Sequence, residues 1–120
     1  MNHSICHIEI PTTDMEKATK FYEGLFGWKI KMEPGSDYAF FDTGTEPGGG
    51  IMKTDKVSQP TGMGLTFYVL VDSIEDTLSK AETLGGKLVK EKTAVGDMGW
   101  FGLFSDLDGN VIGIWKSKPK

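Results

Sequence analysis

The chain has 120 residues, and 13 lysines and arginines stand against 17 aspartates and glutamates, which gives a net charge of −4. This length suits one compact domain, and the acidic balance argues against nucleic acid or a membrane surface as the main partner. The single cysteine cannot form an intramolecular disulfide. No apolar run reaches the roughly 20 residues of a membrane-spanning helix. With no signal-peptide pattern at the start, we expect a cytoplasmic protein.

Taken in chain order, the predicted elements form two similar series. The first series is a strand over 6–10, a helix after Asp14, and strands over 28–33, 38–42 and 50–52. A polar segment with Gly and Pro, 53–64, separates the two series. The second series is a strand over 65–71, a helix after Ser73, and strands over 87–92, 100–104 and 111–115.

The helices of the two series begin and end with the same signals. Asp14 and Ser73 are good N-cap residues, while Gly27 and the Gly85-Gly86 pair can supply the left-handed residue that ends a helix. The early parts of the series match at an offset of about 59 residues and the later parts at about 63, which indicates an internal repeat. Gly35 and Gly109 are expected in turns between strands.

The repeat predicts an α+β domain made of two βαβββ modules, over about residues 5–53 and 64–116. Each module would bury one sheet face under its helix. The other face of each sheet would be left to meet the partner module. We also expect a homodimer, because exposed sheet edges favour association.

Long segments of the chain resemble the vicinal oxygen chelate superfamily of glyoxalases, bleomycin resistance proteins and ring-cleaving dioxygenases. The segments are CHIEIPTTDMEKATKFYEGLFGW, GGGIM, GMGLTFYVLVDSIEDTLSKAETLGGKLV and GWFGLFSDLDGNVIGIW, and together they extend from Cys6 to Trp115. Within the superfamily they look most like the branch related to lactoylglutathione lyase. The resemblance implies that the eight strands of the two modules form an incompletely closed barrel around a cup, usually in a dimer. The fold alone does not fix the chemistry.

The resemblance also implies metal ligands on the first and last strands of each module. Carried over by motif, these positions fall on His7, Gly50, Thr66 and Gly113. Only His7 binds a divalent ion well, whereas catalytic sites usually present about three protein ligands. The glyoxalase reaction needs both a metal and a proton-transferring carboxylate. We therefore expect no conventional glyoxalase I and no cofactor. A weak divalent metal at His7 and Glu9 remains an alternative, because alternation places both side chains on one strand face.

Strand alternation also predicts which side chains line the cup. The expected lining is His7, Glu9, Met52, Thr66, Tyr68 and Trp115, with Phe41, Trp100 and Phe104 as further candidates. An apolar wall with a few polar groups is typical of a small-molecule site. Glycine at the two carboxylate positions makes room without charge, which favours a small aromatic or hydrophobic ligand.

Three functions remain open from the sequence. The first is a domain that binds such a small molecule without the full metal site. The second is a lyase or isomerase related to lactoylglutathione lyase, with His7 and Glu9 as catalytic residues, with or without a divalent metal. The third is an interaction module whose side chains fill the cup. Cys6 is not expected to act as a nucleophile, because alternation turns it away from His7 and toward the core.

Overall fold

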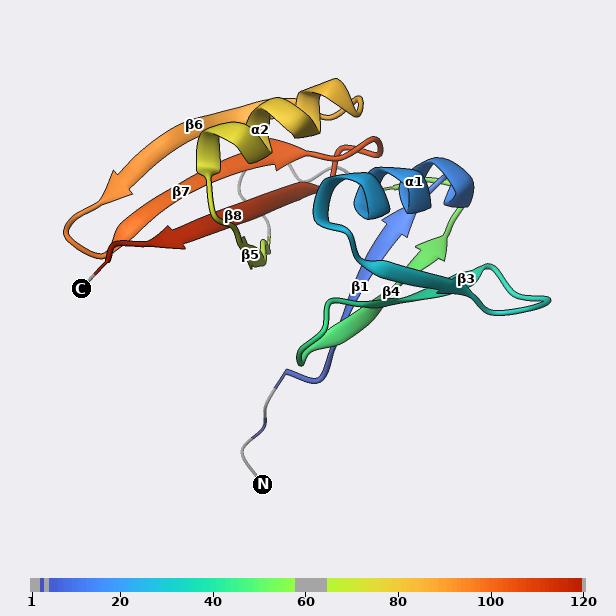
Figure 1. The fold of residues 1–120 in the computed structure, drawn as a ribbon. Helices are drawn as coiled ribbons and strands as arrows, with labels where there is room; N and C mark the ends of the chain where they lie inside the picture. Colours follow the sequence, from blue (N-terminus) through green and yellow to red (C-terminus); the bar gives the residue numbers. More distant parts are fainter. Residues whose placement is uncertain (1–2, 4, 58–64, 120) are drawn as a thin grey trace. The chain divides into compact units, whose positions relative to one another are not determined.

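The computed structural model describes residues 3, 5–57 and 65–119, in two compact units, Met1–Ser58 and Gln59–Lys120. Each unit contains one helix and one four-stranded mixed sheet in the order βαβββ (Figure 1). This confirms the predicted α+β fold class. No helix within the described ranges is long and apolar enough to cross a membrane.

The first module has its strands in the spatial order β1-β4-β3-β2. Its elements are β1 (His7–Thr12), α1 (Met15–Phe26), β2 (Lys29–Met32), β3 (Tyr38–Asp42) and β4 (Gly48–Lys53). β1 and β4 run parallel, while the β4–β3 and β3–β2 pairs are antiparallel. The parallel pair places the first and last strands of the module side by side at one end of the sheet.

The second module repeats this arrangement in the order β5-β8-β7-β6. Its elements are β5 (Tyr68–Leu70), α2 (Ile74–Thr83), β6 (Lys87–Val95), β7 (Gly99–Ser105) and β8 (Val111–Ser117). β5 and β8 are the parallel pair. The predicted strand over 65–71 is therefore shorter in the structure, and Thr66 lies before it.

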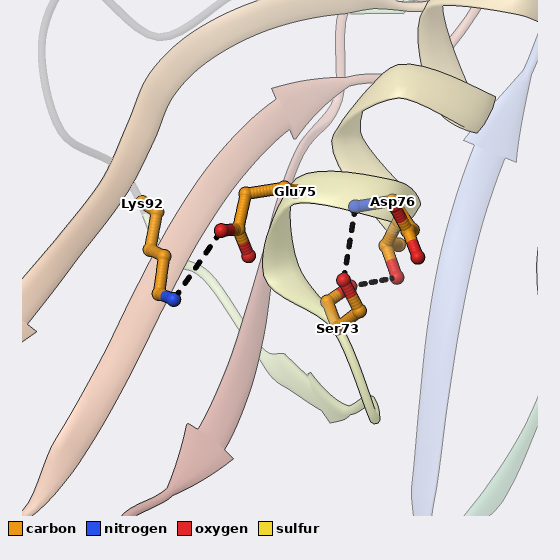
Figure 2. Close-up of polar contacts among 5 residues, drawn as sticks. Ser73, Glu75, Asp76 and Lys92 are labelled. Carbon is orange, nitrogen blue, oxygen red and sulfur yellow. Dashed lines mark hydrogen bonds and ion pairs between the residues drawn. The ribbon is translucent and has the colours of Figure 1, made fainter.

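Local signals start and end both helices as predicted. The Asp14 carboxylate accepts a hydrogen bond from the Lys17 backbone N–H at 3.2 Å, and the Ser73 hydroxyl accepts one from Asp76 at 3.1 Å (Figure 2). These bonds satisfy N–H groups that have no partner inside the helix. Gly27 ends α1 with a φ of 69°. After α2, Gly85 is the member of the glycine pair with a positive φ.

The core of the first module lies between α1 and one face of its sheet. Ile10 and Ile51 are buried there, and Trp28 stacks between Tyr22 and Phe41, with ring centroids 5.4 and 4.5 Å away. Phe41 is only 5% exposed. It therefore belongs to the core under α1 and does not lie on the opposite face, which corrects its prediction as a cup residue.

The second module buries the corresponding face under α2. Phe104 is 0% exposed and is part of this core. A Cβ at Gly102 would meet Ile74 and Leu78 of α2, and Trp100, two residues earlier on β7, shares that face by alternation. Both Phe104 and Trp100 thus lie on the helix side of the sheet, contrary to their prediction as cup residues.

Trp100 takes part in a polar cluster at the start of α2. The Lys92 ammonium lies 4.9 Å from the centroid of the Trp100 ring and forms an ion pair with the Glu75 carboxylate at 3.4 Å (Figure 2). A cation over an aromatic face is an attractive arrangement. The contact with Lys92 therefore accounts for the orientation of Trp100 without a bound ligand.

Candidate functional site

The site is built on the helix-free face of the first sheet, meaning the face opposite α1. His7 and Glu9 are exposed on this face, while Ile10, from the same strand, is buried on the other. The two predicted residues therefore share a strand face. Cys6, which we expected in the core, is exposed, because it precedes β1 and α1 does not cover it.

Tyr38 joins His7 on this face, although it was not among the predicted site residues. The Tyr38 hydroxyl oxygen lies 2.6 Å from His7 Nε2, and the two rings are nearly parallel, with centroids 6.3 Å apart. The contact links β1 to β3, which are separated by β4 in the sheet. In the sequence, only the alternation of Tyr38 with the apolar Ala39 along the strand indicated which sheet face Tyr38 occupies. Its contact with His7 could not be predicted, because that contact depends on how the strands pair.

Gly50 makes this position of Tyr38 possible. A Cβ at Gly50 would collide with the hydroxyl and ring of Tyr38. Gly50 is also the ladder partner of Glu9 on the parallel strand β1. The hydroxyl of Tyr38 therefore lies over β4 beside Glu9. The glycine does not leave an empty space, as we had expected, because a tyrosine ring occupies it.

Electrostatics keep the Tyr38 hydroxyl protonated. Burial, then a hydrogen bond to the Glu9 carboxylate and the charge of that carboxylate, raise the pKa of Tyr38 above its ordinary value of 10.0. The contact between the Tyr38 hydroxyl and His7 Nε2 can be donated from either side, because the role of the ring nitrogen depends on the tautomer of His7. The Tyr38 hydroxyl thus contacts His7 and lies near the charge of Glu9.

An exposed aromatic ring and an open pocket lie next to the contact between His7 and Tyr38. The Phe40 ring is edge-on to Tyr38 at 5.1 Å and to His7 at 6.5 Å, and it is 49% exposed. An open pocket of about 530 Å³ lies beside this ring. It is lined by Cys6, His7, Phe40, Phe41, Asp42, Gly44, Thr45, Glu46, Gly48 and Gly49. Phe41 borders this pocket too, but its ring stacks on Trp28 in the core.

The helix-free face of the second sheet carries Tyr68 and Trp115. The Tyr68 ring occupies the space where a Cβ at Gly113 would lie; it is 51% exposed and edge-on to Phe101 at 6.3 Å. The Trp115 indole N–H donates to the Ser117 hydroxyl at 2.9 Å. In both modules, then, a tyrosine covers the glycine that stands at the carboxylate position implied by the resemblance.

These residues do not fit the four-ligand metal site. A side chain able to bind metal at Gly50 or Gly113 would need the volume that Tyr38 or Tyr68 fills. Across residues 3, 5–57 and 65–119 there is no group of three His, Cys, Asp or Glu side chains that could hold a metal ion.

The βαβββ arrangement of both modules agrees with the family to which comparison with known proteins assigns the chain. A model of the Glyoxalase/Bleomycin resistance protein/Dioxygenase superfamily matches residues 4–114. The chain belongs to this superfamily. A glyoxylase-like domain-containing protein of Didymella fabae is 31% identical, over 95% of this chain and 94% of its own length. A Mycobacterium tuberculosis protein, CFP32, is named as a glyoxylase and is 28% identical over 92% of this chain. The match spans only 44% of the length of CFP32.

Solved structures share the fold of this glyoxalase-like domain. A variant of the fosfomycin resistance protein FosX from Listeria monocytogenes, in complex with Mn(II) and a dihydroxypropylphosphonic acid, has a TM-score of 0.79 at 21% identity. That match covers 98% of this chain and 93% of the FosX chain. A superfamily enzyme from Burkholderia phytofirmans has a TM-score of 0.75 at 20% identity, covering 91% and 94%. At these identities the likeness concerns the fold.

Proposed function

We propose that this glyoxalase-like domain binds a small aromatic or hydrophobic molecule on the helix-free face of its first sheet, without the four-ligand metal site. The observation that supports this most is the 2.6 Å contact between His7 and Tyr38 beside the half-exposed ring of Phe40. Few polar groups next to apolar surface are typical of small-molecule sites. Exposed aromatic rings supply much contact area and a preferred stacking geometry.

The charged residues around the pocket indicate which class of ligand it favours. The pocket beside His7 and Phe40 is also bordered by Asp42 and Glu46, and the whole chain carries a charge of −4. An anionic ligand would meet like charges there, which is unfavourable. A neutral aromatic molecule has no such cost, so this class is the one the surroundings favour.

Calorimetric titration with neutral aromatic fragments in the presence of EDTA tests the proposal. We expect binding to the native chain and at least about tenfold weaker binding to Phe40→Ala, because that substitution removes the exposed aromatic surface. Glu23→Gln, which changes an exposed residue of α1 on the other side of the sheet, serves as the control. Binding that requires added metal, or that is equal in Phe40→Ala, would contradict the proposal. A complete lack of binding would favour the interaction module instead.

The contact between His7 and Tyr38 beside Glu9 also supports a second candidate, a lyase or isomerase related to lactoylglutathione lyase. An imidazole and a carboxylate on one strand face are groups that can accept and donate a proton. His7 and Glu9 would then be the catalytic residues, with or without a weakly bound divalent ion. In this case His7→Ala and Glu9→Gln should each abolish turnover of a substrate found by screening. Equal turnover in both variants and the native chain would remove this candidate.

The homodimer and the cytoplasmic location remain predictions. β2 and β6 lie at the edges of their sheets, and unpaired strand edges favour association with another strand. Light scattering coupled to size-exclusion chromatography would give the mass in solution. A mass of one chain at all concentrations would contradict the dimer.

A further inference from the structure

We infer, on the basis of the proposed function, that Gly48 is a specificity-determining residue and that the space over its Cα takes a flat aromatic ring in preference to a saturated ring. Gly48 begins β4, and its backbone borders the open pocket beside His7 and Phe40. The ligand class of the same site is thereby narrowed from hydrophobic molecules in general to planar aromatic ones.

Three consecutive glycines begin β4, and packing accounts for two of them. A Cβ at Gly49 would collide with the buried ring of Phe41 and with a backbone carbonyl of β1. A Cβ at Gly50 would collide with the ring of Tyr38. Over Gly48, apart from its chain neighbours, the part of the chain that the structure describes places no side-chain atom within 4 Å of an added Cβ. Gly48 is therefore the glycine of the three whose upper side is open to the pocket.

Tyr38 shows how closely a flat ring fits on this face when the strand beneath it is glycine. Its ring lies over Gly50, whose ladder partners are Glu9 on β1 and Phe40 on β3. With no Cβ below, the ring packs directly on the backbone of β4. A gap of about 0.5–1 Å already forfeits a quarter to a half of the dispersion energy of a contact. A flat ring therefore gains more from a glycine floor than a thicker group does.

Gly48 offers the same kind of floor further along the strand. It lies two residues from Gly50 and therefore on the same sheet face, and its ladder partner on β1 is His7. On its other side β3 ends at Asp42, which lines the same pocket. A ring over Gly48 would thus lie between side chains of β1 and β3, as the Tyr38 ring does over Gly50.

Two rings beside this space favour an aromatic ligand over a saturated one. Phe40 lines the pocket, is 49% exposed and is edge-on to His7, with ring centroids 6.5 Å apart. Aromatic pairs in edge-on or offset geometry contribute to binding beyond the area that they bury. A saturated ring lacks this contribution, and its hydrogens above and below the ring hold it further from the backbone of Gly48.

Titration with benzyl alcohol and cyclohexylmethanol in the presence of EDTA tests the ligand class. Both molecules carry the same hydroxymethyl group and differ in the saturation of the ring. We expect benzyl alcohol to bind about two- to tenfold more tightly, the ratio that aromatic pairing supplies. Hydrophobic burial alone favours the saturated ring, which has the larger apolar surface. Equal binding, or tighter binding of cyclohexylmethanol, would overturn this inference and leave the proposed function standing. Binding of neither would overturn the proposed function and this inference with it.

Substitution of Gly48 tests the position of the ring. Gly48→Ala puts a methyl group into the floor, where it meets the Phe41 carbonyl oxygen at 3.3 Å, so the chain should still fold. We expect benzyl alcohol to bind at least about threefold more weakly and its advantage over cyclohexylmethanol to fall to about one. Lys53→Ala, which changes an exposed residue at the other end of β4, is the matched control and should bind both molecules as the native chain does.

Proton NMR of the native chain locates the ring without any substitution. An aromatic ring shields protons that lie beneath its face, so the Hα signals of Gly48 should move upfield on addition of benzyl alcohol and not on addition of cyclohexylmethanol. The Hα signals of Gly50 should already be upfield without a ligand, because the Tyr38 ring covers them. An unchanged ligand preference in Gly48→Ala, or no upfield shift at Gly48, would overturn the assignment of the ring to this position.

Discussion

Tyr38 lies with its ring directly over Gly50, so close that no residue with a Cβ fits beneath it. The second module shows the same relationship between Tyr68 and Gly113. The two tyrosines come from different places, since Tyr38 is on β3 and Tyr68 is on β5, the first strand of its module. In both modules a tyrosine thus covers the equivalent glycine, although the tyrosine comes from a different strand in each. The tyrosine ring fills the volume that a metal-binding side chain at the glycine position would need.

Substitution of Gly50 and its neighbour Gly49 should have very different effects. A Cβ at Gly50 meets the outer end of the partly exposed Tyr38, which can swing away, so Gly50→Ala should cost only about 1 kcal/mol. A Cβ at Gly49 meets the Ile8 carbonyl in β1 and the buried Phe41 ring, so Gly49→Ala should cost about 3 kcal/mol. Urea unfolding measures both free energies. Equal costs would contradict this account of Gly50.

Gly50→Ala should also change the site although it barely changes stability. Displacement of Tyr38 breaks its contact with His7, so the NMR signals of the His7 ring should shift in this variant. Gly96→Ala, in a turn of the second unit with φ of 50° and open space around it, is strained in its backbone but does not belong to the unit that contains Tyr38. It should leave the His7 ring signals in place, and the same shift in both variants would point to a general effect of destabilisation.

Phe40 and Phe41 are adjacent in sequence, and we expect substitution of Phe40 to affect ligand binding and substitution of Phe41 to affect folding stability. Phe41 is 5% exposed and Phe40 is 49% exposed. Phe41→Ala removes a buried ring and should cost about 3–5 kcal/mol, while Phe41→Leu costs less and keeps the chain folded for binding assays. Phe40→Ala should change the unfolding free energy by less than about 1 kcal/mol and weaken binding of aromatic fragments. Calorimetry and urea unfolding of the set measure both effects, and a binding loss in Phe41→Leu but not Phe40→Ala would refute the assignment of faces.

The raised pKa of Tyr38 should appear in the alkaline titration of the chain. Burial is its largest cause, followed by the hydrogen bond to Glu9 and the charge of Glu9. Tyr38→Phe should therefore remove one tyrosinate step that lies above 10.0, and Glu9→Gln should move that step down without returning it fully to 10.0. Absorbance of tyrosinate measures these steps. A Tyr38 step unchanged in Glu9→Gln would show that Glu9 does not act on the hydroxyl.

The raised pKa of Tyr38 also determines how the unfolding free energy changes with pH. Because the folded pKa is raised, the contribution of the neutral Tyr38 hydroxyl is complete below about pH 10, the unfolded value, and is lost as pH rises through the folded pKa. Unfolding free energies measured on both sides of this range should fall less steeply in Tyr38→Phe than in the native chain.

Glu75 should show the opposite pH dependence. Its backbone N–H is the largest cause that lowers the pKa of Glu75 below 4.5, and Lys92 adds to it by hydrogen bonding and charge. Its stabilising contribution is thus present above about pH 4.5 and is lost as pH falls through the lower folded pKa. Lys92→Met should raise the pKa of Glu75 only part of the way to 4.5, as measured by NMR titration. Lys80→Met serves as the control, and a complete return to 4.5 in Lys92→Met would contradict this order of causes.

Local signals in the sequence were enough for the elements and for one strand face. The caps at Asp14 and Ser73 and the strand over 38–42 are as predicted, because each depends on residues close in the chain. The shared face of His7 and Glu9 follows from alternation within one strand. These features need no knowledge of strand pairing.

The features that sequence reasoning missed depend on contacts between strands. Phe40 and Phe41 are both aromatic, so composition could not say which faced the core, and Phe41 was placed on the wrong face. Tyr38 reaches His7 across β4, and this distance of 31 residues in the chain carries no local signal. Reading Gly50 as empty space failed for the same reason, since the ring that fills it comes from β3.

The most direct test of the central claim is a two-dimensional NMR titration of the native chain with p-cresol in the presence of EDTA. The account predicts saturable shifts of backbone amides concentrated at His7, Phe40 and Gly50, with the same affinity when EDTA is replaced by a divalent metal. Shifts that appear only with added metal, or that are spread over α2 and the start of β6, would contradict a metal-independent site on the helix-free face of the first sheet.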